Sequence, residues 1–569
     1  MTVRKWLLAG LSLTALTAPA AAQDYGASYD APPPQEAPPL LPQDVPGEVP
    51  PAARAGGSAV RTDIQPYVEL NQVVFTGTGA DSDVVTYTTV AAGVEARISQ
   101  RRVEAGISAR YERLITYDDN TADSDYLTGL AAGSVQLARG LSVDAGALAA
   151  RSRINAGGAA PSNLVGNPAN TSQIYSVYAG PTLGIQTGGV TIGAAYRAGY
   201  TKVEDEGIDP AFSGVGAVPF DENTSHSVTA SVGQQPGGYL PIGWSVGGGY
   251  ERADGGALDN RFEDYYGRVD LTVPVSPTLA AVGGAGYERI RISERDVVRA
   301  ADGTPVTGDD GRLVVDKSSP RLLAYEQDGF IWDVGVMWRP SRRTSLEARF
   351  GQRYGSEILT GSFSWQLDDR SAVGVAVYDT VTNYGSLLRN RLGGLTPDFQ
   401  AYSNPLTGDI GSCGFTSKGG ICFDDVLQSA DGAAFRSRGV TASYSTDMSG
   451  WKTGIALGYN RRTFLTANDG VQAQIDGISD QNYFANVFVA RDLDALSSVT
   501  ANLYANYYDP GYVGGEVFAV GANAGYNRSL WRGLDATAAL GVDYFDTNDF
   551  SLNNEDVTAS ALLGLRYSF

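Results

Sequence analysis

The sequence predicts an all-β protein: a single transmembrane antiparallel β-barrel of about 22 strands, with short periplasmic turns and long extracellular loops. Two patterns predict it. From Arg61 onward, segments of a dozen or so residues alternate apolar and polar side chains, and short polar turns and longer loops join them alternately. No apolar run beyond the N-terminus is long enough for a spanning helix, which excludes a helical membrane protein. The slightly negative mean hydropathy is typical of strands that are only half apolar.

The first 60 residues differ from the rest. Residues 1–22 have the pattern of a signal peptide: Arg4 and Lys5 precede an apolar core, and small residues lead to Ala22, so that Gln23 would begin the mature chain. Residues 23–60 are predicted to be a disordered periplasmic segment, because nine of the 26 prolines lie between positions 32 and 51. A plain spacer is favoured over a tether to the cell wall or a partner, since composition alone specifies no partner.

The alternation continues to the last residue. Between Glu555 and Phe569 every second side chain is apolar, and Leu562 is the one apolar residue on the polar row. The stretch resembles the closing strand of a bacterial outer-membrane β-barrel. That resemblance implies that Tyr567 and Phe569 form the assembly signal, with the barrel assembly machinery and outer-membrane lipid as partners. This strand alone also fits the edge of a soluble β-sandwich. The pattern of the whole chain is needed to distinguish the two folds.

The connections sort into two sets, which predict two rims. Short turns fall around Gln100, Arg139, Gly188, Pro236, Pro274, Arg342, Asp369, Gly450, Asp494 and Trp531. The other connections fall around Gly79, Asn120, Gly158, Gly214, Gly256, Gly308, Gly355, Ser412, Gly470, Gly514 and Asn548. Alternating the two sets gives about 22 strands, with both ends of the barrel on the periplasmic side.

The aromatic residues predict the same two rims independently. Tryptophans lie near the short turns: Trp244, Trp338, Trp365, Trp451 and Trp531, with Trp332 near the loop end. Tyrosines are expected on the apolar face near the loop ends: Tyr111, Tyr196, Tyr250, Tyr287, Tyr354, Tyr459, Tyr507 and Tyr544. Two aromatic girdles are typical of a barrel that crosses a membrane.

Residues 61–569 as a whole resemble a large, porin-like outer-membrane β-barrel of Gram-negative bacteria. The segments SQIYSVYAGP (Ser172 to Pro181), DVLQS (Asp425 to Ser429) and SRGV (Ser437 to Val440) are similar to those of bacterial chains that sometimes carry the label preprotein translocase subunit YajC. The family of that name has one transmembrane helix, which nothing in this sequence matches. The resemblance implies transport across the outer membrane but names no solute.

The inventory of reactive residues argues against an enzyme. His226 is the only histidine, and its register places it toward lipid. We expect no catalytic residue, no metal site and no cofactor, and the acidic chain is a poor nucleic-acid partner. Cys413 and Cys422 lie in one exported loop and are expected to form a disulfide. Acidic runs in the loops could hold Ca²⁺, although solvated charge is the favoured interpretation.

Charged residues on the polar rows would face the lumen. The pore-lining candidates are Arg97, Arg110, Glu112, Arg197, Arg268, Asp270, Glu347, Arg349, Arg353 and Arg462. They would either pair across strands and stabilise the wall, or form a field that screens solutes. The sequence leaves these two roles open.

Three function classes remain, and a channel for passive diffusion of small hydrophilic solutes is favoured. A structural or surface-display barrel comes second, and a plugless relative of active outer-membrane transporters third. A lumen this wide needs narrowing. The best candidate is the loop from Tyr384 to Arg436, the longest connection, which carries both cysteines and large apolar residues that include Leu387, Leu388, Leu392, Leu395 and Phe399. We predict that it folds inward toward wall charges such as Arg349 and Arg353. The alternatives are an exposed surface loop and narrowing by the second long loop, residues 293–328.

Overall fold

The computed structural model describes most of the chain from Arg61 to the C-terminus. The described residues are 61–78, 84–117, 124–152, 172–205, 218, 220–308, 312–408, 410–416, 419–427, 430–511, 516–548 and 553–569. The predicted signal peptide, the cleavage site between Ala22 and Gln23, and the Pro-rich segment all lie outside these residues.

Twenty-two strands form one antiparallel sheet, as the sequence predicts. They are β1 (Arg61–Gly77), β2 (Val84–Ser99), β3 (Val103–Thr116), β4 (Ser124–Ala138), β5 (Leu141–Ser152), β6 (Ser172–Thr187), β7 (Val190–Asp205), β8 (Glu222–Gln234), β9 (Gly243–Gly255), β10 (Asn260–Ser276), β11 (Leu279–Glu294), β12 (Leu322–Ser341), β13 (Thr344–Arg353), β14 (Ser356–Gln366), β15 (Ser371–Thr382), β19 (Ala434–Met448), β20 (Trp451–Leu465), β21 (Ser479–Asp494), β22 (Ser497–Asp509), β23 (Val517–Trp531), β24 (Leu534–Asn548) and β25 (Asn553–Ser568).

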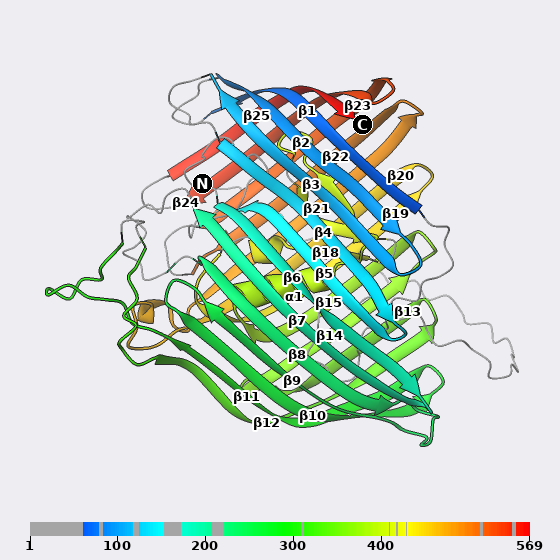
Figure 1. Ribbon diagram of the computed structural model, residues 1–569, viewed down its shortest axis with the longest axis vertical. Helices are drawn as coiled ribbons and strands as arrows, with labels where there is room; N and C mark the ends of the chain where they lie inside the picture. Colours follow the sequence, from blue (N-terminus) through cyan, green and yellow to red (C-terminus); the bar gives the residue numbers. More distant parts are fainter. Residues whose placement is uncertain are drawn as a thin grey trace, which may run out of the picture. The chain divides into compact units, whose positions relative to one another are not determined.

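The sheet closes on itself. Neighbours in the barrel are neighbours in the chain, and β1 pairs with β25 in register from Tyr67↔Ser568 to Gly77↔Thr558. Figure 1 shows the strands crossing the barrel wall obliquely, with the blue β1 beside the red C-terminal strands. Closure leaves no unpaired sheet edge, which a membrane requires because lipid offers backbone groups no hydrogen bonds.

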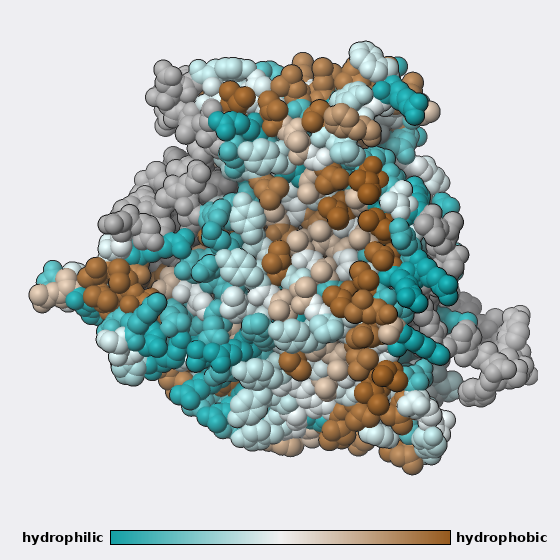
Figure 2. Space-filling view, viewed as in Figure 1, coloured by the Kyte–Doolittle hydropathy of each residue, from teal (hydrophilic) through white to brown (hydrophobic). Residues whose placement is uncertain are grey.

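The period of 2 divides the wall into two faces. Leu503, Leu540 and Leu563 point outward and are 51%, 67% and 69% exposed. Their neighbours Asn523 and Asp543 point inward and are buried. In Figure 2 the outward face is a brown-to-pale band bordered by teal on both sides, as expected for a wall that contacts lipid. Among the described residues, no helix combines the length and apolar character that a membrane crossing requires.

The strands end at two rims. At the turn rim, hairpins such as Arg139–Gly140 and Ser449–Gly450 stand where the sequence predicts the short turns, with Gly140 and Gly450 at positive φ. The opposite ends of the strands form the loop rim. Trp338, Trp365, Trp451 and Trp531 are exposed near the turn rim, and Tyr111, Tyr196, Tyr250 and Tyr287 are exposed toward the loop rim, which confirms this sorting for them.

The prediction for Tyr354 was wrong. Tyr354 and Gly355, at φ 56° and 71°, form a two-residue hairpin between β13 and β14 rather than a longer loop. This turn directs the ring inward, where it is only 6% exposed and packs among apolar residues including Phe262 and Ile290. Arg353 lies over its ring, with the guanidinium carbon 4.7 Å from the centroid.

The C-terminal strand offers a test of which face meets lipid. Ala561 points outward near the middle of β25, opposite Val74 and Leu540. We expect Ala561→Arg to lower the free energy of unfolding in lipid by about 2–4 kcal/mol, because a charge at midplane contacts hydrocarbon. Urea unfolding in lipid vesicles would measure it.

The matched control is Thr558→Arg, on the inward row and opposite Asp543, which should have a smaller effect. Equal effects at both positions would contradict the assigned faces. Phe569 itself ends the chain with its ring 73% exposed, 5.1 Å from the ring of Tyr567. Its backbone N–H donates to the carbonyl of Pro66 at 3.0 Å. The role of these two rings as an assembly signal stays a prediction.

Candidate functional site: a segment inside the barrel

The connection between β15 and β19 folds into the lumen. We call residues 383–433 the inner segment. It contains α1 (Tyr384–Gly393), β16 (Gln400–Ser403), β17 (Ile410–Thr416), β18 (Gly419–Cys422) and α2 (Asp424–Leu427), and β16 to β18 form a small sheet of their own. The described residues of this segment pack against inward-facing residues of β3, β7, β20, β23 and β24. The predicted inward fold is therefore confirmed.

Helix α1 starts at a side-chain cap and buries an apolar face. The Asn383 side chain accepts a hydrogen bond from the Ser386 N–H at 3.0 Å. Leu388 and Leu392 are fully buried, in a cluster that also contains wall residues such as Ile174 and Val203. Each such leucine contributes about 1.5–3 kcal/mol when taken out of water. Burial of this apolar face therefore stabilises the inner segment inside the lumen.

Tyr384, the first residue of α1, is also fully buried, and its ring lies 4.9 Å from that of Phe220. Burial raises the pKa of its hydroxyl, with a smaller opposing effect from Arg462. The side chain is therefore neutral across physiological pH.

An adjacent face of α1 also packs against the wall, at glycines of the helix and of β7. Gly385, Arg389 and Gly393 are spaced four apart and share one face of the helix. A Cβ on Gly199 of β7 would lie 2.9 Å from the Arg389 side chain, so this wall glycine leaves room for the arginine. Arg389 is 1% exposed and pairs with Glu251 of β9 at 3.0 Å.

Other wall glycines form seats of the same kind. A Cβ on Gly454 of β20 would lie 2.6 Å from the ring of Phe415, and one on Gly525 of β23 would lie 2.7 Å from Pro405. Gly106 of β3 similarly faces the carbonyl of Pro397, and Gly541 of β24 faces Leu406. We call Gly106, Gly199, Gly454, Gly525 and Gly541 the glycine seats. Because they lie on five separate strands, the inner segment fits the lumen in one position.

The small sheet of the inner segment is cross-linked. Cys413 and Cys422 are directly opposite each other on β17 and β18 and form the expected disulfide. Cys413 and Phe415 pack against Ala456 and Phe484 of the wall. The bond therefore fixes the strand that presses on β20 and β21.

Arginines on β2, β3 and β5 of the wall also hold the inner segment. Arg97 donates to the carbonyls of Asp398 and Phe399, both at 3.0 Å. Arg110 and Arg151 both donate to the carbonyl of Thr407, at 3.3 and 3.4 Å. Three wall arginines thus donate hydrogen bonds to backbone carbonyls of the inner segment. Arg197 lies beside Gly393 at the end of α1.

Arg349 and Arg353 are engaged elsewhere, so this part of the prediction was wrong. Arg353 pairs with Glu288 at 2.8 Å. Arg349 belongs to a closed ring of charges on β10, β12 and β13. It bonds Asp270 at 3.0 Å and Asp333 at 2.8 Å, and Arg268 bonds the same two carboxylates at 2.5 and 2.8 Å.

Each member of this charge ring is less than 10% exposed. Glu347 adds a further contact to Arg349 at 2.6 Å. Glycine makes the ring possible, because a Cβ on Gly284 of β11 would overlap the Arg268 guanidinium that reaches across that strand. The opposite charges compensate one another, so the ring exerts little electric field on a solute in the lumen.

The candidates Arg110, Glu112 and Arg462 also face inward and are paired. Arg110 bonds Glu69 at 3.0 Å and also contacts Glu112. Arg462 is 3% exposed and bonds both carboxylate oxygens of Asp480, at 3.1 and 3.0 Å from its Nε. Their placement inside follows the predicted register, while their role toward a solute stays a proposal.

Several of these contacts could not be read from the sequence. The glycine seats and the partners Glu69, Glu288 and Asp480 depend on which strands become neighbours or face each other. A signal for the seats existed, since glycine in the middle of a strand marks close approach of another group. His226 is exposed on the outer face, as expected, and its Nδ1 lies 2.8 Å from the Tyr196 hydroxyl.

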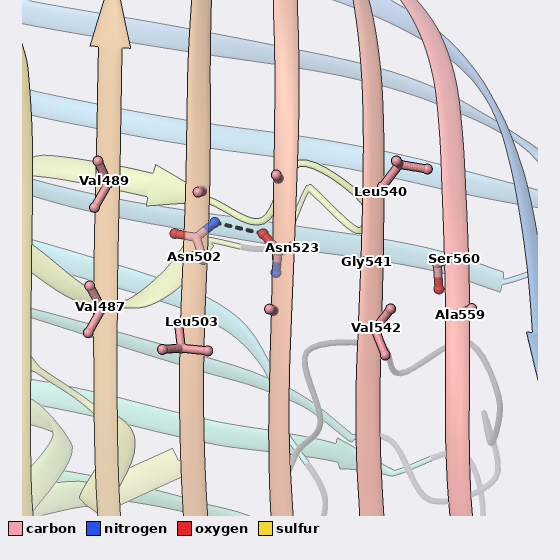
Figure 3. A pocket seen from close by; sticks show the side chains of 13 residues that line it. Val487, Val489, Asn502, Leu503, Asn523, Leu540, Gly541, Val542, Ala559 and Ser560 are labelled. Carbon is pink, nitrogen blue, oxygen red and sulfur yellow. Dashed lines mark hydrogen bonds between the residues drawn. The ribbon is translucent and has the colours of Figure 1, made fainter.

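A shallow pocket lies on the outward face of β21 to β25. Figure 3 shows Val487, Leu503, Val542 and Ala559 beside it, and Ala522 also lines it. Its lining is almost entirely apolar and faces the lipid side of the wall. It therefore belongs to the membrane-facing surface rather than to the lumen.

No protein-family model and no curated protein matches the chain. Among solved structures, the ferric-catecholate import receptor Fiu from E. coli K12, in its open form, is similar with a TM-score of 0.42 and 10% identity, covering 90% of this chain and 82% of that chain. The siderophore receptor PiuA from Acinetobacter baumannii has a TM-score of 0.40 and 10% identity, covering 88% and 82%. The FrpB iron transporter from Neisseria meningitidis has a TM-score of 0.41 and 10% identity, covering 89% and 81%. Likenesses at this level carry no argument about the function of this barrel.

Proposed function

We propose that the protein is an outer-membrane channel that passes small hydrophilic solutes through a lumen narrowed by its own inner segment. One observation carries the proposal: a segment of the barrel's own chain is seated in the lumen, on glycines from five strands. A barrel of this strand number otherwise encloses an aqueous passage much wider than its side chains can fill.

The outer and inner faces support the same function. The outward face is apolar between two aromatic rims, as a membrane position requires. The inward face carries many polar and charged side chains beside its apolar clusters, and some of the polar ones stay accessible, for example Thr229 and Ser362, which are exposed. A purely structural barrel has no need of a polar lumen with a fitted obstruction.

The direct test is conductance of the purified protein in planar bilayers, together with swelling of liposomes in small sugars. We expect small, stable conductance steps and size-limited swelling, because the inner segment narrows the passage. Heat-modifiable migration on a gel would show that the barrel is assembled. An assembled barrel that passes neither ions nor sugars, with or without residues 390–430, would contradict the proposal and favour a structural role.

A further inference from the structure

The turn rim carries a charge opposite to that of the whole chain. The chain has 42 lysines and arginines against 63 aspartates and glutamates, which gives a net charge of −21. The ten short connections at the turn rim instead contain seven arginines and two aspartates, and no lysine or glutamate. The arginines are Arg101, Arg102, Arg139, Arg342, Arg343, Arg370 and Arg532. Positive charge is therefore concentrated at one end of an acidic barrel.

Four of these arginines lie on three successive turns around the closure of the barrel. Arg532 is in the β23–β24 turn, Arg101 and Arg102 are in the β2–β3 turn, and Arg139 is in the β4–β5 turn. The paired strands β25 and β1 stand between the first two of these turns. We call the four residues the cationic arc. The next three turns along the rim, β6–β7, β8–β9 and β10–β11, contain no charged residue.

The cationic arc has no counter-charge of its own. All four arginines are exposed, and their side chains make no hydrogen bond or ion pair within the described part of the chain. Asp63 of the adjacent β1 is engaged by Arg61 at 3.9 Å. Neighbouring hairpins of a sheet stand two strand spacings apart, about 10 Å, which is about one Debye length in 0.1 M salt. The arginines therefore repel one another unless anions from outside the chain compensate them.

The outer face of the barrel places the arc at the depth of lipid headgroups. Leu137, two residues before Arg139, is 55% exposed, and Trp531, immediately before Arg532, is 66% exposed. Exposed tryptophans favour the interface between hydrocarbon and water, so the arginines that follow lie just beyond the hydrocarbon. Figure 2 shows hydrophilic side chains along the right-hand border of the apolar band, where Figure 1 places the turns of β2 to β5.

We propose that the cationic arc binds the phosphate groups of anionic phospholipids in the leaflet that surrounds the turn rim. A guanidinium group matches phosphate oxygens with two parallel hydrogen bonds, which an exposed arginine without a carboxylate partner is free to make. Arginines near an anionic membrane surface also gain from its negative potential. The surface lies on the outside of the barrel, so the proposal holds whether or not the lumen conducts.

The test is competition between phosphatidylglycerol and phosphatidylcholine for the detergent-purified protein, read by native mass spectrometry. We expect phosphatidylglycerol to be retained about fivefold over phosphatidylcholine, the advantage that one arginine at an anionic surface provides. Replacing each of the four arginines by glutamine should bring the ratio close to one, because the side chains then carry no charge. In vesicles of the two lipids, brominated phosphatidylglycerol should quench the tryptophan fluorescence of the wild type more than that of this variant.

The matched control removes the same number of exposed arginines at the loop rim, again by glutamine. These are Arg113, Arg291, Arg438 and Arg461. Arg113 and Arg438 already pair with Asp125 and Asp379, so this variant should keep the lipid ratio of the wild type. Heat-modifiable migration should show both variants assembled. Equal retention of the two lipids by the wild type would overturn the proposal and leave the arginines solvated. An equal loss of preference in both variants would also overturn it, because the cationic arc would then have no special part.

Discussion

Replacing residues 390–430 by a short Gly/Ser linker should raise single-channel conductance roughly tenfold while the barrel still assembles, because a closed sheet of this size encloses an aqueous channel once its obstruction is removed. The replacement spares the strands, since β15 and β19 pair with each other from Ser371↔Thr446 to Thr382↔Phe435 without help from the inner segment. Planar-bilayer recording would measure the conductance, and uptake of a hydrophilic antibiotic by cells would measure the same opening. Unchanged conductance in an assembled variant would show that the segment does not set the constriction.

Point substitutions at the glycine seats test, without a deletion, whether the inner segment sets the constriction of the lumen. Gly454→Leu and Gly106→Leu would each place a side chain where Phe415 or the Pro397 carbonyl now lies, so the inner segment should be displaced and conductance should rise. Gly184→Leu is the matched control: Gly184 also faces inward, on β6, but a Cβ there meets nothing within 4 Å. Equal conductance in all three variants would mean that the seats do not position the segment.

Breaking the charge ring should give the largest loss of stability among single substitutions on the wall. Arg349→Ala leaves Asp270, Asp333 and Glu347 with Arg268 as the one remaining cation of the ring. We expect the free energy of unfolding to fall by about 3–5 kcal/mol, because a buried charge that loses its partner remains desolvated. Urea unfolding in lipid vesicles, followed by tryptophan fluorescence, would measure the loss.

Arg343→Ala is the control for this measurement. Arg343 pairs with Asp369 at 3.0 Å at the turn rim, but their side chains are 52% and 89% exposed. Such a pair contributes about 0–1 kcal/mol. If Arg349→Ala were as mild as this control, water would have to reach the charge ring, and the ring would be part of an open pore wall.

Much of the fold follows from the two-residue alternation of apolar and polar side chains alone. A strand of a membrane barrel must place every second side chain in lipid, so the alternation in segments such as Val103–Tyr111 specifies strand, face and register together. The turns and aromatic rims follow from the same alternation. Tyr354 is the exception, because a two-residue hairpin with two positive φ values overrides the face that its register assigns.

The lumen was less predictable than the wall. The length and leucine content of the inner segment indicated that it would be buried, and the cysteines indicated a bond within it. Its partners could not be predicted, because contacts such as that of Arg97 with Phe399 join residues 302 positions apart. Period and composition describe each strand separately. They do not say which glycine on one wall will face which side chain of a segment that crosses the lumen.

Leu406 lies where the ring of strands is joined. It packs in one cluster with Val73 of β1, Leu114 of β3 and Leu562 of β25. The inner segment therefore touches both the first and the last strands, on either side of the junction that is completed only when synthesis of the chain has ended. In terms of chain entropy, the contact divides the closure between β1 and β25, which spans nearly 500 residues of sequence, into two shorter closures that meet at Leu406.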